Sequence, residues 1–279
     1  MACPASGTNF DVGSKYTNDV GTDYNYCKSG ETCATGVVDY TIVCSAPSQP
    51  TSGTWTLTAD QTLTSEIELT GDLTVNGGGH TLTAATGNRL FKTGSHKLVL
   101  NNVKLTGGDP SGATTDCGGG ATNSDGCSGG AVLVVGGTLE ASDSEFLSSK
   151  GFRGSAIFAR NGATVTLTDC KVNNNENTKS NPDNYCAGGA ITTSQSTTKV
   201  HIIRGEVNNN DIIHNTFGCK TGGLVASDGH FNVTGTTIKG NKGRDGGGIY
   251  VYRYTSLTLT DAIVEDNTAT MRGGGMQIY

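Results

Sequence analysis

Residues 172–191 read VNNNENTKSNPDNYCAGGAI, and residues 207–225 read VNNNDIIHNTFGCKTGGLV. In both stretches a valine and three asparagines precede a variable segment, and the variable segment ends at a pair of glycines. A phrase that recurs in this way indicates an internal repeat, and a repeat determines the fold assignment of the whole chain.

Two marks of this phrase recur through the second half of the chain. The glycine mark begins at Gly129 (GGAV), Gly154 (GSAI), Gly188 (GGAI), Gly222 (GGLV), Gly246 (GGGI) and Gly273 (GGGM). The apolar mark begins at Phe146 (FLSS), Val172 (VNNN), Val207 (VNNN), Ile238 (IKGN) and Val264 (VEDN). The repeating unit therefore spans about 24 to 34 residues.

Short stretches of alternating apolar residues lie between the two marks, as in Val165/Leu167 and Val200/Ile202. Such alternation, bounded by turns, is typical of strands. A unit of this size cannot close its own core, but stacked copies can. The sequence predicts an all-β fold, a right-handed parallel β-helix with three strands per coil. Weaker strand patches at 53–105 raise the expected total to about eight or nine coils.

Four of the five apolar marks end in an asparagine in the same phase: Asn175, Asn210, Asn241 and Asn267. Side-chain amides stacked ~4.8 Å apart can hydrogen-bond to one another, so these residues predict an asparagine ladder. The first two asparagines of each triplet are expected at a corner, where asparagine tolerates unusual backbone angles.

The first strand of each coil is expected to alternate between the core and the outside. The residues predicted to point inward are Val132, Ile157, Ile191, Val225 and Ile249. Those predicted to point outward are Leu133, Phe158, Leu224 and Tyr250.

The paired GGA[ILV] and FxxN-like marks resemble the repeat of chlamydial polymorphic outer-membrane proteins. More loosely, they resemble the right-handed parallel β-helix of the pectate-lyase-like superfamily. The resemblance covers about residues 129–279, with a degenerate extension back to about residue 53. It implies surface adhesion and passenger-domain roles. The wider superfamily also contains polysaccharide lyases and galacturonases, so the resemblance implies a carbohydrate-active enzyme as an alternative.

The composition excludes several classes of function. Glycine accounts for 42 of 279 residues and proline for 5, which favours short strands and tight turns over helices. The formal charge is −6 and there is no basic cluster, so nucleic-acid binding is not expected. No apolar run approaches the ~18 residues that would span a bilayer, so membrane insertion is not expected.

Nine cysteines favour an oxidising, extracellular compartment. Cys3, Cys27, Cys33 and Cys44 predict a small disulfide-bonded module over residues 1–52, with the β-helix over 53–279. Disulfides are also expected between Cys117 and Cys127 and between Cys186 and Cys219. A column of small residues, Ser144, Cys170, Gly205, Thr236 and Ala262, predicts a tight corner and makes Cys170 an unpaired, buried and inert thiol. The sequon Asn232-Val233-Thr234 predicts N-glycosylation at Asn232.

A column of charged residues lies three positions before the apolar marks, at Asp143, Asp169, Arg204 and Asp261. Stacking would place Asp143 and Asp169 about 5 Å apart, where they could bind calcium or a sugar. Alternatively, these aspartates satisfy local amides at a corner, which is the reading we favour, so no metal or cofactor is required. Catalysis on a polysaccharide would need convergent acids, and the isolated Asp228-Gly229-His230 is typical of a turn. The prediction therefore leans against an enzyme.

Coil lengths differ because residues enter one corner, between the asparagine and the next glycine mark. The insertions are residues 106–128, 176–187 and 211–221. Insertions in one phase lie on one side of a repeat protein, which is often its binding side. Beside them, Phe158, Tyr250 and Tyr252 could form an exposed aromatic row that contacts sugars or proteins, or the insertions could cover these rings.

Together these features predict a non-catalytic, secreted structural or adhesive surface protein, in a filament or an extracellular coat. Two alternatives stay open: a carbohydrate-active lyase or hydrolase, and a non-catalytic glycan-binding module. Expected partners are proteins, glycans, or further copies stacked end to end. The last expectation arises because the final strand, residues 276–279, has no capping segment after it. We expect the β-helix either to continue in a longer chain beyond residue 279 or to stack there on another subunit.

Overall fold

The structure is a computed structural model that describes residues 15–17, 23–25, 49–110, 124–177, 188–212, 221–252 and 255–279. The chain divides into two units, residues 1–48 and 49–279. In the first unit, β1 (Lys15–Thr17) pairs with β2 (Asp23–Asn25) in antiparallel fashion. The four cysteines predicted to staple this unit lie outside the described residues.

The second unit contains three parallel sheets of eight strands each. Sheet I contains β3 (Gly53–Thr56), β6 (Leu73–Asn76), β9 (Lys97–Asn101), β12 (Thr138–Ser142), β16 (Thr164–Thr168), β20 (Lys199–Ile203), β24 (His230–Thr234) and β28 (Ser256–Thr260). Sheet II contains β4 (Gln61–Thr62), β7 (Thr81–Thr83), β10 (Lys104–Thr106), β13 (Glu145–Leu147), β17 (Lys171–Asn173), β21 (Glu206–Asn208), β25 (Thr237–Lys239) and β29 (Ile263–Glu265). Sheet III contains β5 (Ile67–Glu68), β8 (Phe91–Lys92), β11 (Val132–Val135), β15 (Ile157–Arg160), β19 (Ile191–Thr193), β23 (Leu224–Ala226), β27 (Ile249–Val251) and β31 (Met276–Ile278).

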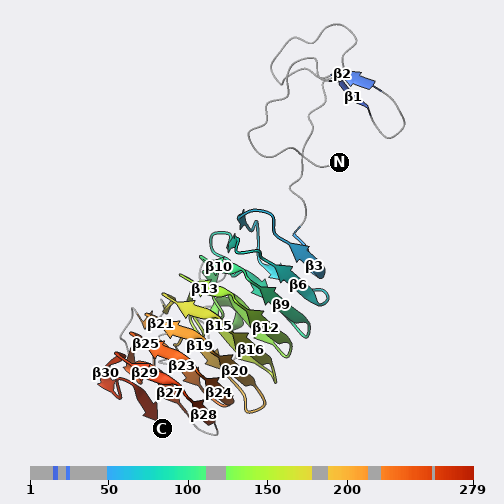
Figure 1. The fold of residues 1–279 in the computed structure, drawn as a ribbon. Helices are drawn as coiled ribbons and strands as arrows, with labels where there is room; N and C mark the ends of the chain where they lie inside the picture. The colour runs from blue at the N-terminus through green and yellow to red at the C-terminus, as the bar shows by residue number, and fades with distance from the viewer. Residues whose placement is uncertain are drawn as a thin grey trace. The chain divides into compact units, whose positions relative to one another are not determined.

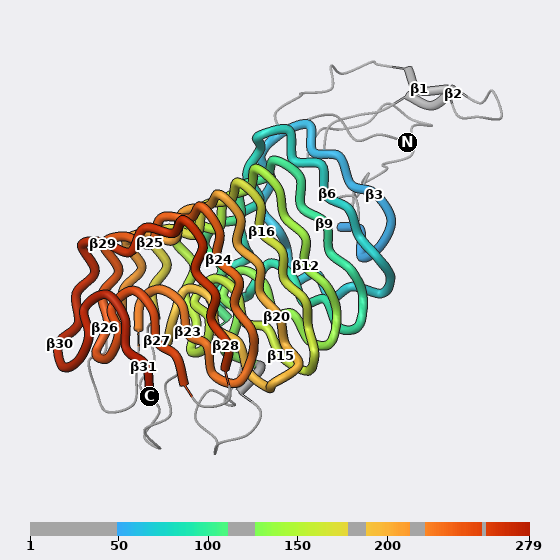
Figure 2. The backbone as a smooth tube through the Cα atoms, turned by 60° about the horizontal axis from the view of Figure 1, so that its bottom comes forward, coloured from blue at the N-terminus to red at the C-terminus, as the bar shows by residue number. Residues whose placement is uncertain are grey.

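The chain passes through sheets I, II and III in turn, so each strand pairs with its equivalent one coil away (Figure 1). The backbone tube shows the successive coils lying one upon another (Figure 2). This all-β arrangement of stacked parallel sheets is consistent with a parallel β-helix.

Five coils contain a fourth short strand directly after the apolar mark, so the prediction of three strands per coil is incomplete. Three of these strands, β14 (Lys150–Gly151), β18 (Glu176–Asn177) and β22 (Asp211–Ile212), form one parallel sheet. The other two, β26 (Lys242–Asp245) and β30 (Thr268–Arg272), pair with each other. The described part of the chain contains the 3₁₀ helix η3 (Ser124–Cys127). No helix among these residues has the length and apolar character needed to cross a membrane.

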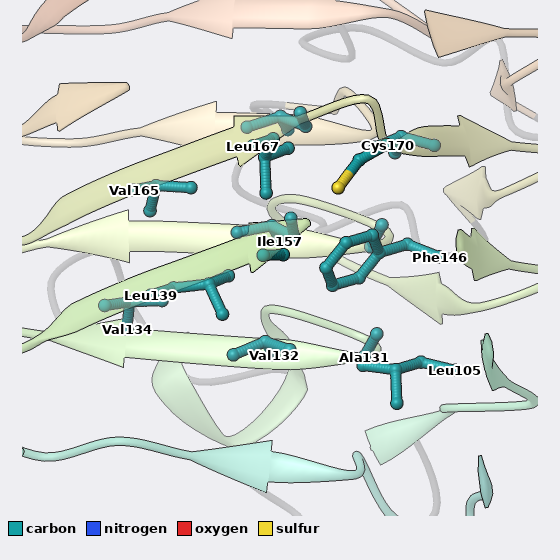
Figure 3. Close-up of a cluster of buried hydrophobic side chains, with 14 of the residues drawn as sticks. Leu105, Ala131, Val132, Val134, Leu139, Phe146, Ile157, Val165, Leu167 and Cys170 are labelled. Carbon is teal, nitrogen blue, oxygen red and sulfur yellow. The ribbon is translucent and has the colours of Figure 1, made fainter. Parts of the chain in front are cut away.

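Inward-facing residues of the three sheets form one continuous core (Figure 3). Val165 pairs in register with Leu139 in the coil before and with Val200 in the coil after. Phe146 and Ile157 enter the same core from sheets II and III, and both are fully buried. Burial of one such side chain contributes about 1.5–3 kcal/mol, which explains why a coil needs its neighbours.

The glycine mark is required by backbone geometry at the start of sheet III. Gly154 has φ 61°, a left-handed conformation that side chains disfavour. A Cβ at Gly130 would overlap the main-chain carbonyl of Lys150 in the following coil. The mark therefore lets adjacent coils approach closely at this corner.

Strand β23 has a different register from the predicted one. Leu224 pairs with Ile191 and Ile249, and all three side chains lie in the core. Val225 pairs with Thr192 and Tyr250, on the opposite face of sheet III. The prediction that Val225 points inward is wrong. The glycine mark at Gly222 lies one residue closer to the paired strand positions than the marks of the neighbouring coils do, so Leu224 and not Val225 aligns with Ile191.

Candidate functional site

The four predicted ladder asparagines hydrogen-bond to one another in series. Nδ2 of Asn175 donates to Oδ1 of Asn210 at 3.0 Å, Asn210 to Asn241 at 2.9 Å, and Asn241 to Asn267 at 2.9 Å. Each Oδ1 also accepts the backbone N–H of the asparagine in the preceding coil. Asn175, Asn210 and Asn241 are buried, so the side chains of this ladder have a structural role.

The first asparagine of each triplet belongs to a second, opposite ladder, which the sequence reasoning missed. Oδ1 of Asn173 accepts the N–H of Asn208 at 2.9 Å, and Oδ1 of Asn208 accepts the N–H of Lys239 at 3.0 Å. Asn173 and Asn208 end strands β17 and β21 and are not corner residues. The prediction of a corner is wrong for them because their amides bridge neighbouring strands of sheet II.

The middle asparagines, Asn174 and Asn209, do occupy the corner. Their φ angles are 57° and 55°, and both side chains are exposed. Ser148 takes the same place one coil earlier, with φ 49°. Among the described residues, the side chains of these three make no hydrogen bond.

A polar groove passes over these three corner residues. It has a volume of about 310 Å³ and is lined by Ser148, Lys150, Asn174, Asn175, Glu176, Asn209 and Asp211. Lys150 Nζ lies 3.0 Å from Glu176 Oε2, and Asp211 Oδ2 lies 3.5 Å from Nζ of Lys242 outside the groove. The groove went unpredicted because the short strands that form one wall carry no strand pattern in the sequence.

The charged column forms a second corner, between sheets I and II. Asp143, Asp169, Arg204 and Asp261 all have left-handed φ angles, between 49° and 54°. Nε and an Nη of Arg204 donate to the two carboxylate oxygens of Asp169 at 2.9 and 2.6 Å. This side-chain hydrogen bond lowers the pKa of the Asp169 carboxyl, although desolvation opposes the shift.

The pairing with Arg204 bears on the calcium and sugar hypotheses for Asp143 and Asp169. A cation at Asp169 would have to displace a guanidinium that already engages both carboxylate oxygens. Within the described ranges, no group of three or more His, Cys, Asp or Glu residues is arranged to hold a metal ion.

The sequence left open whether the aromatic row is exposed or covered, and its first members are buried. Leu133, Phe158 and Tyr250 do face away from the main core, but they are 0%, 1% and 3% exposed. Arg153 lies over the ring of Phe158 at 6.0 Å from its centroid, and a second apolar cluster contains Cys127, Phe152 and Ile212. Strands β11, β15, β19, β23 and β27 of sheet III are therefore buried on both faces, so Phe158 and Tyr250 form no exposed platform. Of the two alternatives left open by the sequence, their burial agrees with the one in which these rings are covered.

The tyrosines form a short stack at the far end of sheet III. Tyr250 stacks on Tyr252 with ring centroids 6.2 Å apart, and Tyr252 stacks on Tyr279 at 5.4 Å. Burial raises the pKa of Tyr250 to about 12, and the nearby Asp245 carboxylate adds to the shift. Only the outer part of this stack is accessible, since Tyr252 is half-buried and Tyr279 is exposed.

Two cysteines fall within the described residues. Cys170 is a free, buried thiol whose Sγ lies 3.3 Å from the carbonyl oxygen of Thr168. Burial raises its pKa to about 11, which makes the reactive thiolate scarce at neutral pH. Cys127 is buried and disulfide-bonded. Cys117, Cys186 and Cys219 lie outside the described residues.

The sequon residue Asn232 lies on the outer face of sheet I. Its side chain and that of Thr234 are exposed on strand β24. Nδ2 of Asn232 lies 3.3 Å from Nδ1 of His201 in the preceding coil. The sequon is therefore accessible from solvent in the folded chain.

The insertions leave the coils at matching positions. Asn177 and Ile212, each the second residue of an insertion, pair in register. The buried Arg89 holds the described end of the third, with an Nη donating to the carbonyl of Ser128 at 3.0 Å. This anchor has no sequence signal, since an isolated arginine normally lies on the surface.

Comparisons with protein-family models, with curated proteins and with solved structures give no match to this chain.

Proposed function

We propose that this protein is a non-catalytic, secreted rod of the cell surface, with an adhesive or structural role. In this proposal the stacked coils form a rigid support, and the inserted segments along one side contact the partner. The observation that carries the proposal is that the first residues of two insertions stack on one another, since Asn177 pairs in register with Ile212.

The use of the polar columns supports a structural role. The Asn175 and Asn173 ladders and the pair of Asp169 with Arg204 all join one coil to the next. A general acid in a glycosidase needs a raised pKa, whereas the pKa of Asp169 is lowered. These groups are therefore better suited to holding coils together than to transferring protons.

The setting and the partners belong to the same proposal. An extracellular location follows from the cysteine content and the sequon at Asn232. Proteins, glycans or further copies of this chain are the proposed partners, and no metal or cofactor is required. The right hand of the coils and a relation to pectate-lyase-like or polymorphic outer-membrane proteins are likewise proposed, on the strength of the glycine and asparagine marks.

The proposal is tested by removing the insertions while keeping the coils. One coil already crosses this corner with a short connection that contains Phe152 and Arg153. Replacing residues 178–187 and 213–220 with Phe-Arg gives a shortened variant, and Thr166→Ala on the outer face of sheet I gives a matched control. Beads coated with each protein are scored for clumping and for attachment to the cells that produce it.

The unaltered protein and the control are expected to clump or attach, and the shortened variant is expected to lose most of that activity. No attachment by the unaltered protein, or equal attachment by the shortened variant, would refute the proposal. A polysaccharide-cleaving activity that disappears in Asp143→Ala with Asp169→Ala would establish the enzyme alternative in its place.

A further inference from the structure

We propose that the polar groove over Ser148, Asn174 and Asn209 binds a neutral, extended glycan chain along the direction of coil stacking. The groove is lined by described residues, and the shortened variant that tests the adhesive function, which replaces only 178–187 and 213–220, retains all of them. The proposal is therefore independent of the adhesive function argued above.

The first support is the unequal use of three adjacent asparagines. In VNNN, the first and third side chains are hydrogen-bonded in the two ladders: Oδ1 of Asn208 accepts the N–H of Lys239, and Nδ2 of Asn210 donates to Asn241. The middle side chain, that of Asn209, is exposed and has no hydrogen-bond partner among the described residues. Asn174 repeats this arrangement one coil earlier, so free amides stand in register along the groove.

The left-handed backbone alone does not account for these amides. Asparagine is tolerated at positive φ, but glycine suits that conformation better. The chain itself uses Gly240, with φ 67°, at the equivalent place in the next coil. Ser148, which is not a residue preferred at positive φ, contributes a hydroxyl at this corner instead.

The second support is the shape of the groove. One wall is the corner column of Ser148, Asn174 and Asn209, and the other is the column of Lys150, Glu176 and Asp211. These columns cross three coils, which at ~4.8 Å per coil gives a length of about 10 Å. A hexopyranose in an extended β-1,4-linked chain advances by about one coil spacing, so one unit would face each of the three coils.

The chemistry of the lining selects a neutral glycan. Side-chain amides both donate and accept hydrogen bonds, which matches sugar hydroxyls. One ammonium (Lys150) and two carboxylates (Glu176 and Asp211) leave a net charge of −1 on the lining residues, and Lys242 beside Asp211 offsets it. The groove therefore offers a polyuronate no excess of positive charge, which favours a neutral chain. None of the described residues that line the groove is aromatic, so binding at these residues depends on hydrogen bonds and not on stacking.

The test is calorimetric titration with β-1,4-linked glucan oligosaccharides of one to six units, with polygalacturonate as the anionic comparison. Affinity is expected to rise up to three units and then level off, and polygalacturonate is expected not to bind. The double variant Asn174→Gly with Asn209→Gly removes both amides and adopts the residue found at Gly240. It should lose about tenfold or more in affinity, since each lost hydrogen bond weakens binding severalfold.

Asn161→Gly is the matched control, because Asn161 is also exposed with a left-handed φ of 59° but lies at another corner. It should leave affinity unchanged. Glu176→Gln with Asp211→Asn reverses the net charge of the lining and should admit polygalacturonate. The variant without insertions 178–187 and 213–220 should retain glucan binding, which separates this site from the adhesive proposal.

The proposal is overturned if none of the oligosaccharides binds at millimolar concentration. It is equally overturned if the Asn174→Gly, Asn209→Gly double variant binds as well as the unaltered protein, or if polygalacturonate binds the unaltered groove more tightly than the glucan does. Circular dichroism of each variant confirms that the coils are intact.

Discussion

At the residue scale, individual positions are governed by local backbone geometry and by burial. Asp143, Asp169, Asn174 and Asn209 all have positive φ, a conformation that aspartate and asparagine adopt more readily than other residues with a side chain. Cys170 shows the effect of burial: a thiol held among apolar side chains resists ionisation and is consequently inert.

Because of Cys170, the free energy of unfolding is expected to fall as pH rises in the alkaline range. Its folded-state pKa of about 11 exceeds the ordinary value of 9.0, so the folded chain favours the protonated thiol. Its contribution is fully present below pH 9.0 and is lost as pH rises from 9.0 to about 11. Two pKa units correspond to about 2–3 kcal/mol.

This loss is measured by urea denaturation of the unaltered protein and of Cys170→Ala at several pH values. Tyrosines and lysines titrate in the same window, and they affect both proteins equally. The difference in unfolding free energy between the two proteins should therefore narrow as pH rises. A difference that stays constant from pH 8 to pH 11 would show that the thiol is not shifted.

At the element scale, the corners are held by side chains that bond from coil to coil. Asn210 accepts from the backbone and side chain of Asn175, and it donates to the carbonyl of Val172 and to Asn241. The neighbouring Asn209, one residue away, makes none of these bonds. Position within the corner therefore decides whether an asparagine supports the fold.

Asn210→Ala should destabilise the protein by about 3 kcal/mol, because it leaves several buried polar groups without partners. Asn209→Gly should change stability by less than about 0.5 kcal/mol, because glycine accepts its left-handed backbone and no bond is lost. Both values come from urea denaturation followed by circular dichroism. Equal effects of the two substitutions would contradict the ladder as a source of stability.

At the scale of the whole second unit, each coil is stabilised by the coils on either side. Leu167 and Val233, in the interior of the stack, are fully buried. In the coil formed by β28, β29, β30 and β31, Leu259, Ile263 and Ile278 are 37%, 53% and 68% exposed. A stack of this kind behaves as a series of repeats coupled to their neighbours, so its stability varies along its length.

Native-state hydrogen exchange should reveal this gradient. Amides of β16 and β20 are expected to exchange slowest, by global unfolding, whereas amides of β28 and β29 should exchange through local opening of lower free energy. Leu167→Ala should therefore speed exchange across many coils, and Leu257→Ala should affect mainly its own. Uniform protection across all eight strands of sheet I would show that the stack opens as a single unit.

The repeat, the parallel strands and the residues of the main ladder can all be predicted from the amino-acid sequence. Each of these follows from a local phase: Asn175 and Asn210 lie three residues after an apolar anchor, and Val165 and Leu167 alternate as a half-buried strand must. When the coils stack, residues at the same position of the repeat come to lie in one column. The repeat pattern alone therefore predicts which residues form the core and the asparagine ladder at one corner.

What covers the outer face of the coils can be seen only in the three-dimensional structure. Phe158 points away from the main core, as its position in the alternating strand predicts, yet it is buried. Segments outside the repeat pattern cover it, and the sequence pattern does not predict where those segments pack. The register of Leu224, the fourth short strands and the free amides of Asn174 and Asn209 likewise depend on contacts between coils. Alternation along one strand specifies which face a side chain occupies, whereas only the packing of other segments determines whether that face meets solvent.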